Sequence, residues 1–210
     1  NEIEIPRGGE FDLVLADGTQ VWLNAESRLR YPVEFSGKER KVVLEGEAYF
    51  QVKKNPSLPF RVEIRNQVIE VLGTEFNVSG YKDEVHVYTT LVNGKVKVAT
   101  TGRDMTLLPG EQCVLDTGDG SMIRQQVDVD KIISWKKGKF ILEEQTLEQI
   151  MQKLARWYDI TVFYQNPALK NKVFKGSVPR YAELQQVLNI LEKTGEVQFH
   201  IQNRTVIVKE

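Results

Sequence analysis

The segment FDLVLADGTQVWL, residues 11–23, decides the fold of the first half of the chain. Apolar residues occupy every second position on both sides of the turn pair Asp17-Gly18, at Phe11, Leu13, Leu15, Val21 and Leu23. Alternation of this kind around an Asp-Gly pair is typical of a β-hairpin. The segment therefore predicts two antiparallel strands joined by a tight turn.

Similar short apolar runs continue to about residue 127. They cover residues 41–44, 48–52, 60–64, 68–72, 76–78, 85–91, 96–98 and 113–115. Turn residues separate most of these runs, and none of them sustains a helical period over three turns. Many short strands with regular turns are typical of a β-sandwich or β-roll, so we expect an all-β domain over residues 1–130.

The pattern changes near Trp135, and we expect a domain boundary between about 127 and 139. A T-x-x-Q capping box, Thr146 to Gln149, begins one amphipathic helix, and Gly195 follows a second. The two helices and their flanking strands repeat at an offset of 37 residues, as the printed sequence shows. Residues 135–210 therefore predict a small α+β domain with β-α-β-β-α-β-β order.

Composition narrows the function classes. The net charge is −1, so no global field recruits nucleic acid or a membrane surface. Cys113 is the only cysteine, which excludes an internal disulfide framework and a cysteine-based zinc site. No apolar run approaches the ~20 residues of a membrane span. The chain begins at Asn1 without an initiator methionine or signal peptide, so we expect a fragment of a longer protein.

Residues that could carry chemistry are few. His86 and His200 lack the spacing of a metal site, and we expect no metal and no cofactor. No G-x-S-x-G, Walker or G-x-G-x-x-G element occurs, so we expect a protein that is not an enzyme. The β-α-β-β-α-β order also occurs in RNA-recognition motifs, but residues 172–178 carry one aromatic residue and do not match their stacking strand. We therefore expect no nucleic-acid partner.

A resemblance to FecR-family anti-sigma regulators rests on several segments that occur in order. We call them the signature segments: LADGTQVWLNAES (15–27), LEGEAYFQV (44–52), PFRV (59–62), VLGTEFNV (71–78) and LPGEQ (108–112). The tail resembles the small C-terminal domain of members from Bacteroidetes, through LARWY (154–158) and FKG (174–176). That domain is similar in layout to the secretin/TonB N-terminal short domain.

The resemblance implies the periplasmic sensor part of a single-pass inner-membrane protein. Its implied partner is the signalling domain of a TonB-dependent outer-membrane receptor, whose signal reaches an extracytoplasmic-function sigma factor. The sigma factor would bind a cytoplasmic segment upstream of Asn1. The alternative is a periplasmic carbohydrate- or ligand-binding β domain, in which exposed Trp22, Trp135 or Trp157 stacks on sugars.

Two sites follow as expectations. Some FecR-like regulators resemble self-processing proteins, and the bond between Gly73 and Thr74 is the candidate for an N-to-O acyl shift by the threonine hydroxyl. The alternative is that Gly73 permits a tight turn and Thr74 starts a strand. We also expect the C-terminal domain to bind its partner by strand addition. The candidate sheet edge is the final strand, Thr205, Val206, Ile207 and Val208.

Overall fold

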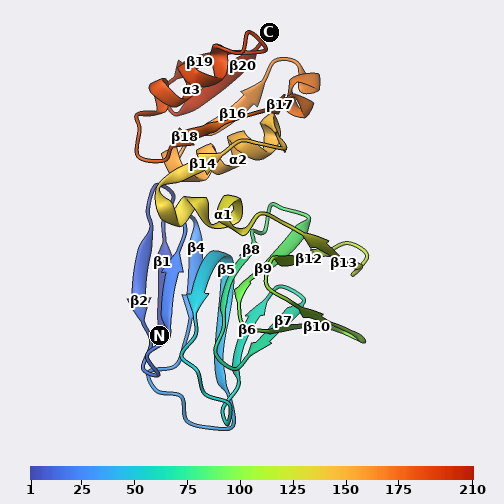
Figure 1. Ribbon diagram of the computed structural model, residues 1–210. Coiled ribbons are helices and arrows are strands. Elements are labelled where there is room, and N and C mark those ends of the chain that lie inside the picture. The colour runs from blue at the N-terminus through green and yellow to red at the C-terminus, as the bar shows by residue number, and fades with distance from the viewer. The chain divides into compact units, whose positions relative to one another are not determined.

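The computed structural model describes all residues, 1–210, and divides into two compact units, Asn1–Ile133 and Ser134–Glu210 (Figure 1). The division lies inside the interval of about 127 to 139 in which the sequence pattern changes. That each unit folds alone stays a prediction. We describe the two units separately.

The N-terminal unit is built from strands and one short helix. The strands are β1 (Glu2–Ile5), β2 (Phe11–Val14), β3 (Gln20–Leu23), β4 (Ser27–Arg30), β5 (Arg40–Gln51), β6 (Phe60–Ile64), β7 (Gln67–Val71), β8 (Glu75–Gly80), β9 (His86–Asn93), β10 (Val96–Thr100), β11 (Arg103–Leu107), β12 (Glu111–Asp116) and β13 (Met122–Gln126). The helix α1 (Val129–Ile132) follows and packs near β9.

Two layers of strands share β5. Its first half pairs with β4 and β6, and its second half pairs with β3 and β8. One layer has the order β1-β4-β5-β6-β7-β10-β11, and the other has the order β2-β3-β5-β8-β9-β12-β13. The strand changes layers at Gly46, which has a φ of 91°. The mainly β sandwich predicted from the alternating pattern is confirmed.

The core of this unit lies between the two layers. Alternating side chains of each strand point inward, and Leu44 and Val62 of one layer lie in the same buried cluster as Phe50 and Phe76 of the other. The rings of Phe50 and Phe76 stack with their centroids 5.1 Å apart. Burial of these apolar side chains is the main source of stability of the sandwich.

The C-terminal unit begins within the 3₁₀ helix η1 (Ile133–Lys137). Its other elements are β14 (Lys139–Ile141), β15 (Gln145–Thr146), α2 (Leu147–Tyr158), β16 (Thr161–Tyr164), η2 (Pro167–Asn171), β17 (Val173–Phe174), β18 (Ser177–Pro179), α3 (Leu184–Glu192), β19 (Gln198–Gln202) and β20 (Thr205–Lys209). The capping box is present, because Thr146 and Gln149 each bond the other's backbone amide. The α+β class is confirmed.

The strands of this unit form separate small sheets. β14 pairs with β18 and β15 pairs with β17, while β16, β20 and β19 form a three-stranded sheet in that order. α2 contacts β15 and β16, and α3 contacts β18 and β19. Each helix therefore contacts one strand of a two-stranded sheet and one strand of the three-stranded sheet, and both helices belong to one apolar core.

The last strand is central, which corrects one expectation. β20 pairs in parallel with β16 and antiparallel with β19, so both of its sides are hydrogen-bonded. Val206 and Val208 are fully buried, whereas Thr205 and Ile207 are partly exposed. The prediction that Thr205–Val208 forms a free edge is wrong, because the final strand inserts between the two strands that follow the helices.

Candidate functional site

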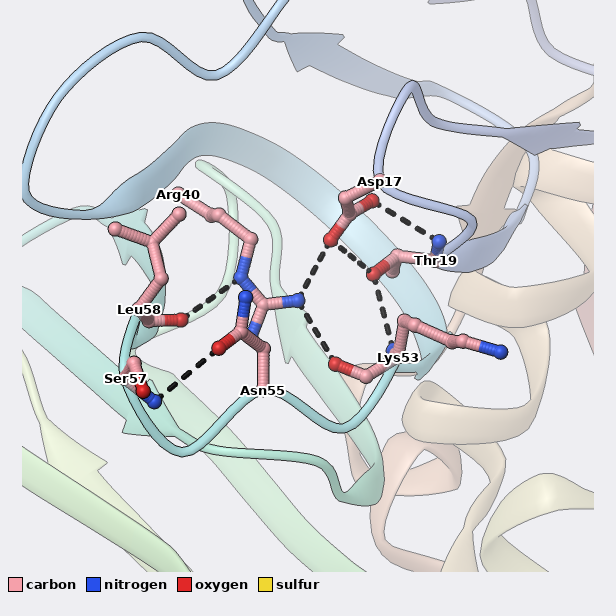
Figure 2. A network of polar contacts seen from close by, with 7 residues as sticks. All are labelled: Asp17, Thr19, Arg40, Lys53, Asn55, Ser57 and Leu58. Carbon is pink, nitrogen blue, oxygen red and sulfur yellow. Dashed lines mark hydrogen bonds and ion pairs between the residues drawn. The ribbon is translucent and has the colours of Figure 1, made fainter.

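The turn of the first signature segment is held by a buried arginine (Figure 2). Arg40, at the start of β5, is 1% exposed. Its Nη1 donates to Asp17 Oδ2 at 2.7 Å and to the Lys53 carbonyl at 2.8 Å, and its Nε donates to the Leu58 carbonyl at 2.9 Å. Asp17 also accepts from the Thr19 amide and hydroxyl. One guanidinium therefore joins the β2–β3 turn to the segment before β6.

A carboxylate joins three of the signature segments. Glu47 on β5 accepts hydrogen bonds from Asn24 Nδ2 at 2.7 Å and from Asn77 Nδ2 at 3.0 Å. On the same strand, the Tyr49 hydroxyl donates to Glu75 at 2.8 Å, and burial raises the pKa of this hydroxyl. These contacts fix the register of β3, β5 and β8, so the polar residues of the signature segments specify the fold.

The structure gives Gly73 and Thr74 packing roles. Gly73 has a φ of 148°, and a Cβ at this position would lie 2.6 Å from Lys54 Cα. The Thr74 side chain donates to the Lys95 carbonyl at 2.9 Å, and Thr74 is 5% exposed. The carboxylate of the next residue, Glu75, accepts a hydrogen bond from the Tyr49 hydroxyl. This geometry supports the turn-and-strand alternative, and self-cleavage itself stays untested.

Other reactive groups are dispersed or buried. No three metal-ligating side chains cluster anywhere in residues 1–210. Burial raises the pKa of the Cys113 thiol to about 11, which disfavours the reactive thiolate. His86 faces Asp116 at 3.6 Å on one unit, and His200 lies on β19 of the other. Neither histidine nor Cys113 therefore belongs to a cluster of three metal-ligating side chains.

The tryptophans proposed for sugar stacking are packed against other side chains. Trp135 is 6% exposed. The Arg180 guanidinium lies 3.9 Å from the Trp157 ring centroid, and Tyr181 meets the same ring edge to face. Trp22 contacts Tyr49 in the same way. Trp22 and Trp157 keep intermediate exposure, and the carbohydrate-binding alternative stays untested.

The free edges of the three-stranded sheet in the C-terminal unit are β16 and β19, since β20 lies between them. The strands alternate, with Phe199 and Ile201 packed against the core and His200 exposed on the outer face. On β16, Phe163 points to the outer face and is 58% exposed. In register it lies beside Ile207, which in turn lies beside His200. The sequence pattern indicated these strands but not which of them end the sheet.

Comparisons with known proteins match both units. The family model described as FecR protein matches residues 1–97, and the model described as FecR, C-terminal, matches residues 139–208. No curated protein matches the chain.

Two crystal structures of a proposed anti-sigma factor from Parabacteroides distasonis are similar over the whole fold. They are each 28% identical in sequence, with TM-scores of 0.92 and 0.91. Each comparison covers 100% of this chain, and 99% and 98% of the respective crystallised chains. The fold and its signature residues thus define a regulatory protein with a signalling role. The chain belongs to the FecR family of anti-sigma factors.

Proposed function

We propose that this chain is the periplasmic sensor of a single-pass inner-membrane anti-sigma factor. It binds the signalling domain of a TonB-dependent outer-membrane receptor and relays that signal to an extracytoplasmic-function sigma factor. The sigma factor binds a cytoplasmic segment outside the residues described. No helix of the structure has the length and apolar character needed to cross a membrane.

The observation that carries this proposal is the pair of free edges on the three-stranded sheet of the C-terminal unit, β16-β20-β19. An exposed Phe163 lies on the outer face of this sheet beside one of these edges. A strand edge next to an exposed apolar side chain suits recognition of another polypeptide, because backbone hydrogen bonds and one apolar contact form together. A catalytic role has no comparable support in the arrangement of side chains.

The paired charges on the surface of the N-terminal sandwich also support the proposal. The outer surface of the sandwich carries opposite charges that pair across neighbouring strands, such as Lys41 with Glu63 at 2.6 Å and Arg61 with Glu70 at 2.6 Å. Paired surface charges add little affinity for a partner and keep a broad sheet from adhering to other sheets. The sandwich therefore suits a scaffold, and the recognition surface belongs to the C-terminal unit.

A pull-down tests this proposal. The purified chain is immobilised and exposed to the isolated signalling domain of the TonB-dependent receptor encoded beside its gene. A signalling domain from an unrelated receptor is the control. The proposal is supported if the signalling domain of the receptor encoded beside the gene is retained and the domain of the unrelated receptor is not. If neither domain is retained, or both are retained equally, the proposed partner is wrong.

A further inference from the structure

The two free edges of the three-stranded sheet, β16 and β19, differ in how their outward backbone amides are satisfied. In β19, the Phe199 amide does not bond to β20, and alternate residues of a strand share a direction. The Phe199 and Ile201 amides therefore point away from the sheet. In β16, Thr161 and Gln165 donate to carbonyls of the β20 segment, at 2.8 and 3.0 Å.

The β19 edge is closed by a charged side chain. The Phe199 amide donates to Glu192 Oε1 at 2.7 Å, and Glu192 is the last residue of α3. A strand added here would have to displace a carboxylate from a charge-assisted hydrogen bond. Charged side chains at sheet edges are a common way of preventing strand addition.

At the β16 edge no carboxylate binds an outward amide, and the nearby charged side chain, Lys170 of η2, lies over the Tyr164 ring with its Nζ 5.3 Å from the ring centroid. The alternation along β16 directs the Val162 and Tyr164 amides away from β20, and no side chain hydrogen-bonds to either of them. The side chains of Val162 and Tyr164 are only partly buried against the core, so a neighbouring strand would complete their cover. Phe163, between them, is exposed on the outer face.

We infer that β16 is the docking edge and that an extended strand of the receptor's signalling domain adds to it. This inference rests on the proposed function. β16 has four residues, so it spans about 13 Å and exposes only two outward amides. An edge this short cannot by itself bury the ~1,200 Å² of a specific interface, so the partner must also cover the neighbouring outer face of the sheet.

The residues on the outer face of the three-stranded sheet indicate what the rest of the partner's contact surface must contain. Phe163 and Ile207 form an apolar centre, and polar residues of the three strands surround it: Thr161, Gln198, His200, Gln202, Thr205 and Lys209. An apolar centre within a polar rim is the usual anatomy of a protein interface. The strand that docks at β16 therefore carries an apolar residue beside Phe163, and the body of its domain covers Ile207.

Matched proline variants test this edge in the full chain. Val162→Pro removes an outward amide from β16, and Ile201→Pro removes the corresponding amide from β19. Neither removes a hydrogen bond to β20. Calorimetric titration uses the signalling domain of the receptor encoded beside this gene. We expect Val162→Pro to weaken binding about tenfold or more, and Ile201→Pro to change it less than about threefold.

A second pair covers the case in which a proline variant fails to fold. Phe163→Ser should also weaken binding about tenfold, while Val173→Ser, at an equally exposed apolar residue, should not. Wild-type affinity in both Val162→Pro and Phe163→Ser would overturn the inference, as would a larger loss in Ile201→Pro. Absence of binding by the wild-type chain would instead refute the proposed function, on which the inference depends.

Discussion

Arg40 and Asp17 form an ion pair inside the sandwich, with Nη1 and Oδ2 2.7 Å apart and side chains 1% and 13% exposed. The guanidinium also lies 5.4 Å from the centroid of the Phe60 ring. The pair connects the first hairpin turn with the long shared strand, two segments 23 residues apart. A charge at this depth is tolerated because carboxylate, carbonyls and ring all face it.

Loss of one partner should therefore be costly. We expect Arg40→Met to lower the free energy of unfolding by about 3 kcal/mol or more, because Asp17 is left without its partner. The control is Arg28→Ala, which breaks a 2.7 Å ion pair with Glu4 at the surface and should cost less than about 1 kcal/mol. Urea unfolding measures both, and equal losses in the two variants would refute the buried pair's importance.

Gly46 should tolerate no side chain. A Cβ there would lie 2.8 Å from Ser27 Cα, in addition to the strain of a φ of 91°. Gly102 has a similar φ of 81° but nothing within 4 Å of its Cβ position. We expect Gly102→Ala to cost about 1–2 kcal/mol from strain alone, and Gly46→Ala to cost roughly 3 kcal/mol or more. Thermal unfolding compares them, and equal costs would contradict the close approach of β4 to β5.

The Gly73–Thr74 bond should stay intact, because the Thr74 hydroxyl is engaged with the Lys95 carbonyl and no base faces it. Intact mass spectrometry of freshly purified and long-incubated protein should show a single species. Thr74→Ala should change only stability, by about 1 kcal/mol for the lost hydrogen bond. Two fragments that meet at this bond, and that disappear in Thr74→Ala, would show self-cleavage after all.

Alkaline pH should destabilise the fold. Burial raises the pKa of Tyr158 to about 12 and that of Cys113 to about 11. Both groups keep their protons in the folded state at pH values where the unfolded chain has released them, so stability falls as the pH rises from about 9 to 12. Unfolding midpoints across this range should fall less steeply in Tyr158→Phe. An identical slope in that variant would exclude its contribution.

The fold class and most of the element order were predictable from local signals. Apolar alternation and the Asp17-Gly18 turn indicated the hairpins, and the capping box at Thr146 located the start of α2. These signals lie within a few residues of one another, so a single sequence carries them. The signature segments also indicate the family from their sequence alone, without the contacts that join them.

The position of β20 was not predictable in the same way. Which strands end a sheet depends on pairings between distant segments, here the parallel pairing of β16 with β20, in which Thr161 lies beside Thr205. Alternating apolar residues occur in central and edge strands alike when one face is solvated. The Glu192 contact with the Phe199 amide was equally hidden, because the spacing of a helix end and a strand does not specify a hydrogen bond between them.

The most direct test of the account is to measure which of the two units binds the signalling domain of the receptor. Residues 134–210 and 1–133 are produced separately, their folding is checked by circular dichroism, and each is titrated with the same signalling domain beside the full chain. We expect the C-terminal unit to fold alone and to bind within about threefold of the full chain's affinity, with no binding by the N-terminal unit. Binding by the sandwich alone would contradict the account.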